Sequence, residues 1–224
     1  MYNIRKEKNQ QFKILKNKKW CDRIYYMNIN WYGQTCFKIS VSGAKNGQIN
    51  IIIDPPTKDS GLRGPKLESD ILLSTDVKEK IPSGSYFSVT GPGEYDIKDA
   101  HIQGIKAENA TIYTIEAEDM KLCHLGRITQ KELTSEQVEL LGEVDILFLP
   151  IGIDSKQSVK MMSQIEPKVI IPMYYKISKS KEKLDSINSF LKVLGIKNLE
   201  KTSKLSIKAK DLPKEEVKII GLEA

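Results

Sequence analysis

The chain contains few of the side chains that usually carry metal-dependent hydrolysis. Its two histidines are His101 and His124, in a total of 224 residues. A hydrolytic zinc site typically uses about three protein ligands, with imidazole prominent among them. Two histidines cannot supply a site built from several imidazoles. His124 with scattered carboxylates such as Asp54, Asp76 and Glu79 could form only a weak site for a hard cation.

These residues must be positioned by a β-rich first half and a mixed second half. Apolar runs bounded by Gly, Pro and Asn predict short strands, at residues 28–32, 36–41, 48–54, 70–74, 86–90, 95–97, 101–105, 111–117, 121–124, 145–149, 169–173, 204–207 and 217–222. Apolar residues at helical spacing predict three helices, at residues 134–141, 155–165 and 181–194. Thr134 and Gln137 have the spacing of a capping box. This order of elements indicates an α/β fold with helices outside β-sheets.

The net charge of +6 is concentrated at the start of the chain. Residues 1–26 contain eight Lys and Arg but only two Asp and Glu, so the remainder is neutral. We expect a basic extension over residues 1–26 and one domain over residues 27–224. The extension has no apolar core typical of a signal peptide. Two interpretations stay open: a basic, partly disordered arm, or a wrongly assigned start with translation beginning at Met27.

The cysteine count and the apolar runs indicate a cytoplasmic protein without a membrane partner. Three cysteines without a CxxC pair favour reduced thiols, and Cys36 and Cys123 lie in apolar strand patterns. No apolar run approaches the ~18 residues of a membrane-spanning helix. Because the body of the chain is neutral, the composition also argues against nucleic acid as the main partner.

Five segments together resemble one family. They are WYGQTCFKI at 31–39, IIIDP at 51–55, GPGEY at 91–95, CHLG at 123–126 and IIPMYYK at 170–176. In this order they resemble the ascorbate-6-phosphate-lactonase-like branch of the metallo-β-lactamase superfamily, from Met27 to about Leu222. The resemblance implies a four-layer αββα sandwich with a site along one edge. It also implies one or two metal ions, usually zinc, that activate a bound hydroxide.

The sequence departs from the family at the main ligand motif, His-x-His-x-Asp-His. The corresponding positions after the strand at 70–74 are Thr75, Val77, Glu79 and Lys80. The three histidines of the motif are therefore replaced, and Glu79 alone keeps carboxylate character. The family loop before the strand at 111–117 is also shortened here, to residues 106–110.

The remaining ligand positions are altered in the same way. The chain keeps His124 and Gly126 of the family's His-x-Gly-Asp pattern but has Arg127 in place of the metal-bridging Asp. The last family ligand, a His between Met and Tyr, is Tyr174 here. We therefore expect no zinc and no other cofactor, and His124 is the one weak candidate for a ligand. We expect a remnant pocket formed by Asp54, Thr75, Asp76, Glu79, Lys80, His124, Arg127 and Tyr174.

The basic residues expected in that pocket also oppose metal binding. Lys80 and Arg127 place positive charge where a dication would lie, which opposes metal entry by a few kcal/mol per pair at an effective dielectric constant of about 20. Our hypothesis is that Arg127 or Lys80 pairs with Asp54 or Glu79 and substitutes for the missing metal charge. His101 is interpreted as a polar residue of an edge strand.

Three functions remain open. The first is a catalytically inactive homologue that binds a partner, either a second copy of itself or an active paralogue. The second is a weakly active metal-dependent hydrolase of lactones or phosphoesters that uses His124, Glu79, Asp54 and Tyr174. The third is an anion or nucleic-acid binder that uses the basic extension with Lys80 and Arg127. The lysines of residues 176–183 are interpreted as a solvated loop, with anion binding as the alternative.

Overall fold

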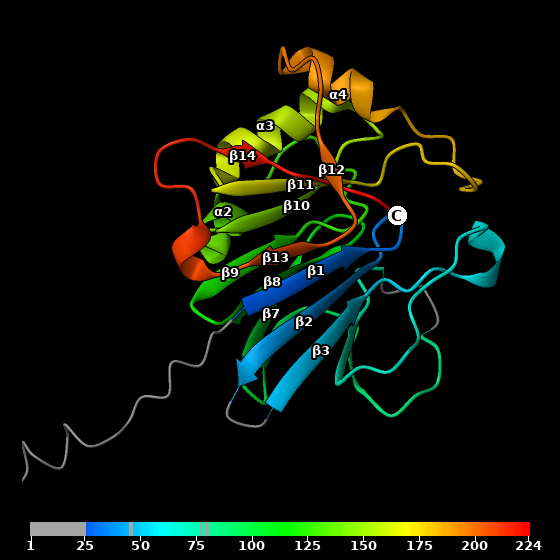
Figure 1. Cartoon of the computed structure of the whole chain (residues 1–224), viewed down its shortest axis with the longest axis vertical. Coiled ribbons are helices and arrows are strands. Elements are labelled where there is room, and N and C mark those ends of the chain that lie inside the picture. Colours follow the sequence, from blue (N-terminus) through cyan, green and yellow to red (C-terminus); the bar gives the residue numbers. More distant parts are fainter. Residues whose placement is uncertain (1–25, 45–46, 77, 79–80) are drawn as a thin grey trace, which may run out of the picture.

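Two β-sheets stacked face to face form the body of the molecule (Figure 1), in a computed structural model that describes residues 26–44, 47–76, 78 and 81–224. The first sheet has six strands in the order β13-β1-β2-β3-β4-β5. Its strands are β1 (Tyr26–Trp31), β2 (Phe37–Ala44), β3 (Gly47–Ile53), β4 (Ile71–Leu73), β5 (Phe87–Val89) and β13 (Leu205–Ile207). Strands β1 to β3 are antiparallel, whereas β3, β4 and β5 are parallel.

The second sheet has seven strands in the order β14-β11-β10-β9-β8-β7-β6. They are β6 (Gly93–Ile97), β7 (Ala100–Lys106), β8 (Thr111–Ala117), β9 (Met120–His124), β10 (Ile146–Pro150), β11 (Val169–Met173) and β14 (Lys218–Ile219). Strands β6 to β9 are antiparallel, and β9, β10, β11 and β14 are parallel. A small third sheet pairs β12 (Lys201–Thr202) with β15 (Gly221–Leu222).

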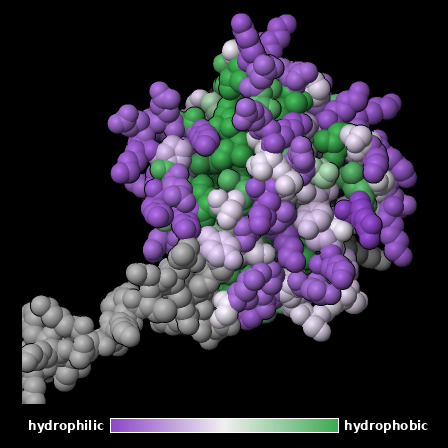
Figure 2. All heavy atoms as spheres, viewed as in Figure 1, coloured by the Kyte–Doolittle hydropathy of each residue, from purple (hydrophilic) through white to green (hydrophobic). Residues whose placement is uncertain are grey.

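The core lies between the two large sheets. In β1 the apolar Met27, Ile29 and Trp31 are buried, whereas Asn28 and Asn30 on the other face are half-buried. This alternation follows from the two-residue repeat of a strand. On the face shown in Figure 2, a patch of hydrophobic residues interrupts a mainly hydrophilic surface.

Two of the helices contact the seven-stranded sheet, and α4 (Ile187–Val193) contacts α3 (Ser155–Ile165). The structure also describes α2 (Ser135–Leu141) and two 3-10 turns, η1 (Lys58–Ser60) and η2 (Ala209–Asp211). Helix α2 contacts β7, and α3 contacts β10 (Figure 1). Both faces of β10 and β11 are therefore covered, and all their residues are buried. The predicted α/β architecture of stacked sheets with outer helices is confirmed.

Most predicted elements agree with the structure, and two do not. The predicted capping box is present, because Thr134 Oγ1 accepts from the Gln137 amide and Gln137 Oε1 accepts from the Thr134 amide. The predicted helix at 181–194 is shorter and begins at Ile187. Its first residues are held in a loop, where the Asp185 amide donates to the Gly152 carbonyl. The predicted strand at 217–222 is split between β14 and β15.

The basic extension at 1–25 lies outside the described residues, so the predicted domain boundary stays a prediction. A candidate for a membrane-spanning helix is absent from the part of the chain that the structure describes.

Candidate functional site

Four of the predicted site residues come together where strands of both sheets end. Asp54 follows β3, Thr75 follows β4, His124 ends β9 and Tyr174 follows β11. The carboxyl ends of parallel neighbours meet at one edge, and ligand sites of α/β sheets lie at such ends. The sandwich therefore brings residues 120 positions apart in the chain to one edge, from Asp54 to Tyr174.

The Asp54 carboxylate is bonded by Thr75. The Thr75 amide donates to one carboxylate oxygen at 2.7 Å, and the Thr75 hydroxyl donates to the other at 2.6 Å. Burial raises the pKa of Asp54, while the Thr75 hydrogen bonds and the charge of Arg127 lower it in part. Asp54 also has a φ of 46°, in the left-handed region. Each carboxylate oxygen thus accepts one hydrogen bond from Thr75.

His124 is fully buried, and protein atoms occupy both of its ring nitrogens. Nε2 lies 3.0 Å from the Thr35 carbonyl, and Nδ1 accepts from the Gly126 amide at 3.1 Å. Since an amide can only donate, Nδ1 carries the lone pair and Nε2 carries the proton that it donates to the carbonyl. Burial lowers the pKa of His124 to about 4, so the ring is neutral near pH 7. The Phe37 and Phe148 rings pack against it.

The Thr75 side chain fills the space between the ends of β4 and β9. Gly126 has a φ of 62°, and a Cβ there would lie 2.7 Å from Thr75 Oγ1. Thr75 itself is buried, and its carbonyl accepts from the Thr111 amide at 2.8 Å. The glycine is therefore required by close packing as well as by its backbone conformation.

Arg127 and Tyr174 form a second, more open part of the site. The Arg127 guanidinium lies 5.6 Å from the centre of the Tyr174 ring, and Nη1 lies 3.8 Å from a Glu182 carboxylate oxygen. Burial and Glu182 raise the pKa of Tyr174 to about 12. Tyr174 has a φ of 52°, and its amide donates to the Gln34 carbonyl at 3.1 Å. Arg127 thus acts on Asp54 through its charge, while its ion pair is with Glu182.

The other predicted site residues are placed differently. Asp76 is half-buried and accepts from the Lys78 amide at 2.8 Å, so its carboxylate closes a local turn. Val77, Glu79 and Lys80 lie outside the described residues. The hypothesis that Lys80 or Glu79 takes part in a charge pair therefore stays a prediction.

The loop at residues 176–183 was predicted, but its contacts with this edge were not. Glu182 contacts Arg127, and Gln34 Nε2 donates to Ser180 Oγ. The Trp31 indole in turn donates to the Gln34 carbonyl at 2.9 Å. Gln34 belongs to the WYGQ motif segment, so the motif could have identified it as a residue of this edge. Ser180 and Glu182 lie in a Lys-rich loop where no spacing rule distinguishes them.

These donors do not fit the zinc centre that the fold implies. Within residues 26–44, 47–76, 78 and 81–224, no three or more His, Cys, Asp and Glu side chains are grouped so that they could hold a metal ion. His124 would have to give up a hydrogen bond to expose a lone pair, and Asp54 could offer only the lone pairs that Thr75 leaves free. A zinc site needs several such lone pairs directed at one point.

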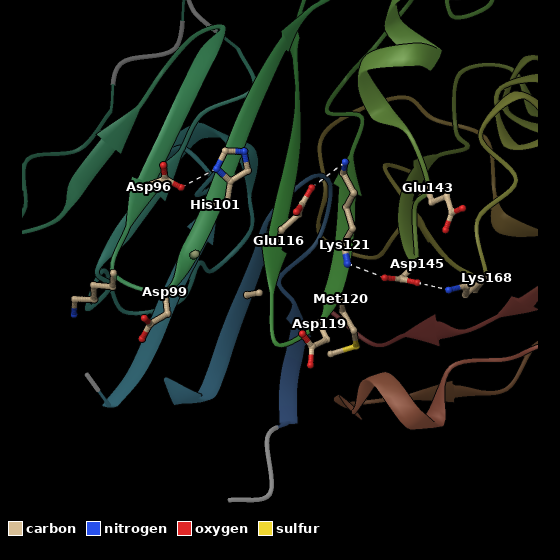
Figure 3. A pocket seen from close by; sticks show the side chains of 13 residues that line it. Asp96, Asp99, His101, Glu116, Asp119, Met120, Lys121, Glu143, Asp145 and Lys168 are labelled. Carbon is tan, nitrogen blue, oxygen red and sulfur yellow. Dashed lines mark hydrogen bonds and ion pairs between the residues drawn. The ribbon is translucent and has the colours of Figure 1, made fainter. Parts of the chain in front are cut away.

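A pocket of about 680 Å³ lies at the opposite end of β9 (Figure 3). Its charged side chains are largely paired: Lys121 with Glu116 at 2.9 Å, and Lys168 with Asp145 at 2.7 Å. His101 also lies here, with Nδ1 2.8 Å from Asp96 on the neighbouring strand. The pocket is a surface hollow with six carboxylates and three lysines. His101 is a partly exposed polar residue of β7, and the prediction of an edge strand is wrong, because β6 lies outside β7 in the sheet.

Comparisons with known proteins agree with this architecture. A search among curated proteins finds no match. A solved structure from Thermotoga maritima, described as a candidate Zn-dependent hydrolase of the metallo-β-lactamase superfamily, is 27% identical with a TM-score of 0.73. The match covers 88% of this chain and 100% of that chain.

Two further structures show the same fold at lower identity. A metallo hydrolase from Ignicoccus hospitalis is 15% identical with a TM-score of 0.58, covering 82% of this chain and 99% of its own. A candidate metal-dependent hydrolase from Parabacteroides distasonis is 17% identical with a TM-score of 0.53. That match covers 77% of this chain and 91% of the other. The family model described as "Beta-lactamase superfamily domain" matches residues 28–174. Since the match spans more than half of the chain and the architecture agrees, the protein belongs to the metallo-β-lactamase superfamily.

Proposed function

We propose that this chain is a binding protein of the metallo-β-lactamase fold whose former metal site is closed by protein contacts. The observation that carries the proposal is His124, whose two ring nitrogens are both used in buried hydrogen bonds. A hydrolase of this family requires a bound metal to make hydroxide available near neutral pH. The Asp54–Thr75 hydrogen bonds and the charge of Arg127 support the same conclusion.

The proposal also includes the family branch, the cellular compartment and the protein partner. The five motif segments favour the ascorbate-6-phosphate-lactonase-like branch, as an inactive member. Buried Cys36 and Cys123 are free thiols, which favours a cytoplasmic protein. A second copy of the chain or an active paralogue is the proposed protein partner. Size-exclusion chromatography with light scattering tests the first of these partners, and co-purification with the paralogue tests the second.

Metal analysis tests the proposal directly. Protein expressed with added zinc should contain clearly less than one zinc per chain, and should cleave neither generic phosphodiester nor lactone substrates. Stoichiometric zinc in the purified wild type would show that the proposal is wrong.

A reconstructed variant sharpens this test. It carries Thr75→His, Val77→His, Lys80→His, Arg127→Asp and Tyr174→His, which restore the ligand types that the family motif has at these positions. If those replacements are what excludes the metal, the variant should take up zinc when the wild type does not. Circular dichroism of both proteins checks that the variant is folded before its metal content is compared.

A further inference from the structure

A second concave region lies beside the closed site, where β1 and β11 end near the C-terminus (Figure 1). We call it the β1/β11 pocket, and its volume is about 790 Å³. It is lined by Trp31 and Tyr32 after β1, by residues 61–63, by residues 176–179, and by residues from the last part of the chain. The volume lies within the range of small-molecule sites, roughly 300–1,000 Å³.

The rim of this pocket carries positive charge that is not compensated by ion pairs. Its four basic residues are Arg63, Lys176, Lys179 and Lys201. Among the described residues, none of these four is within ion-pair distance of a carboxylate. The lining also holds two negative charges, the Glu223 side chain and the C-terminal carboxylate of Ala224, so the four basic residues leave it net positive. This differs from the pocket of Figure 3, where opposite charges are paired.

The pocket lining also contains aromatic and apolar side chains: Trp31, Tyr32, Leu62, Ile177 and Leu222. The buried Trp31 ring lies 5.0 Å from the Tyr175 ring, and the Lys201 ammonium lies 5.4 Å from the centre of that same ring. Tyr175 is 1% exposed, yet its hydroxyl has no hydrogen-bond partner in the structure. A buried phenol normally finds a partner. Tyr175 does not itself line the pocket, but its ring contacts Trp31 and Lys201, which do.

The two loops around the pocket are held together by backbone contacts. The Lys181 amide donates to the Ser60 carbonyl at 3.3 Å. Gly61 has a φ of 79°, and a Cβ there would lie 2.4 Å from the Lys179 carbonyl oxygen. At this distance any side chain at position 61 would separate the loops. The pocket is consequently preformed, which lowers the entropy cost of binding.

We infer that the β1/β11 pocket binds a small aromatic phosphate, of the chemical class of a nucleotide. Unpaired Lys and Arg side chains supply the charge that a phosphate group needs, and Arg can bind two of its oxygens at once. The aromatic and apolar side chains of the lining suit the flat part of such a ligand. The inference goes beyond the proposed function, because it requires neither a metal nor the closed site.

Fluorescence titration of the full chain with AMP, in buffer containing EDTA, tests this inference. Trp31 lies in the pocket, and the other tryptophan of the chain is Trp20. A Trp20→Phe background therefore makes Trp31 the single reporter. We expect saturable AMP binding that is tighter than binding of inorganic phosphate or adenosine alone, and that weakens as salt increases.

A pair of variants locates the binding. Lys176→Gln with Lys179→Gln should weaken AMP binding by about tenfold, since two charge-assisted contacts are lost. The matched control is Lys208→Gln with Lys210→Gln, which removes two charges outside the pocket and should leave binding unchanged. Thermal melting of each variant confirms that the fold is intact.

Three outcomes would overturn the inference: no saturable AMP binding by the wild type, equal weakening in both variants, or much tighter binding of a short single-stranded oligonucleotide than of AMP. The last would indicate a nucleic-acid surface rather than a small-molecule site. Zinc analysis of the same samples separates the two proposals, because stoichiometric zinc would overturn the proposed function while leaving AMP binding as it stands.

Discussion

The two ends of strand β9 hold their polar side chains in opposite ways. At the carboxyl end, His124 is buried, neutral and bonded through both ring nitrogens. At the other end, Lys121 pairs with Glu116, whose side chain is 48% exposed, at the rim of an open pocket (Figure 3). Buried hydrogen bonds are costly to break, whereas exposed ion pairs contribute little. The comparison indicates that the carboxyl end of β9 contributes more to the stability of the fold than the other end does.

Removing the imidazole at the buried end should have the largest effect. His124→Ala leaves the Thr35 carbonyl and the Gly126 amide without partners and opens a cavity between two aromatic rings. We expect a loss of about 3–4 kcal/mol in the free energy of unfolding, measured by urea denaturation. The control is His101→Ala, which should change stability by less than about 0.5 kcal/mol. Equal effects of the two substitutions would contradict the comparison.

Low pH should reduce the stability that His124 contributes at the carboxyl end of β9. The pKa of His124 is about 4 in the folded chain and 6.5 ordinarily, so the unfolded state binds more protons between these values. Stability should therefore fall as pH decreases from about 6.5 to about 4, by about 3 kcal/mol in total. His124→Gln should remove this slope in urea denaturation series. A wild-type stability that is flat over this range would contradict the burial argument.

Asp54 should contribute in the opposite direction. Because its pKa is raised in the folded chain, the folded state binds more protons just above the ordinary pKa of a carboxyl. Its contribution to stability therefore decreases as pH rises through that window. Asp54→Asn should accordingly make the net increase in stability from about pH 4 upward steeper than in the wild type, in the same urea series.

The contact between Asp54 and Thr75 should show an intermediate effect. Thr75→Val keeps the shape of the side chain but removes the hydroxyl that donates to the carboxylate at 2.6 Å. We expect a loss of about 1–3 kcal/mol, because a buried acceptor loses one donor. Thr75→Ser keeps the hydroxyl and should cost less. If the two variants were equally stable, the hydroxyl would have no structural role.

Breaking the ion pair at the exposed end should have the smallest effect. Glu116→Gln removes the charge that lies 2.9 Å from the Lys121 ammonium. We expect a change of less than about 1 kcal/mol, which decreases further at high salt. A loss as large as that of His124→Ala would remove the distinction between the two ends of β9.

Local patterns predicted the framework of the fold because they depend on residues close in sequence. The capping box of Thr134 and Gln137 needs a spacing of three residues, and the strand patterns need a spacing of two. The helix expected at 181–194 failed for a different reason. Its first residues are held by distant backbone groups, such as the Gly152 carbonyl that accepts from Asp185, and these override the apolar periodicity.

The site was predictable in its position but not in its contacts. The family resemblance predicted Asp54, Thr75, His124 and Tyr174 at one edge, and in the structure each of them ends or follows a strand there. The hydrogen bonds and ion pairs of these residues join partners far apart in the chain, such as Thr75 with Asp54 and Glu182 with Arg127. No spacing rule connects such pairs, because the tertiary fold alone sets their distance.

The left-handed backbone at Asp54 and Tyr174 has a consequence for the history of this edge. Neither residue is a glycine, so a positive φ costs each of them of the order of 1 kcal/mol. On the proposed function, the loops at Asp54 and Tyr174 have kept the backbone conformation of an ancestral enzyme, although the metal ligands of that enzyme were replaced.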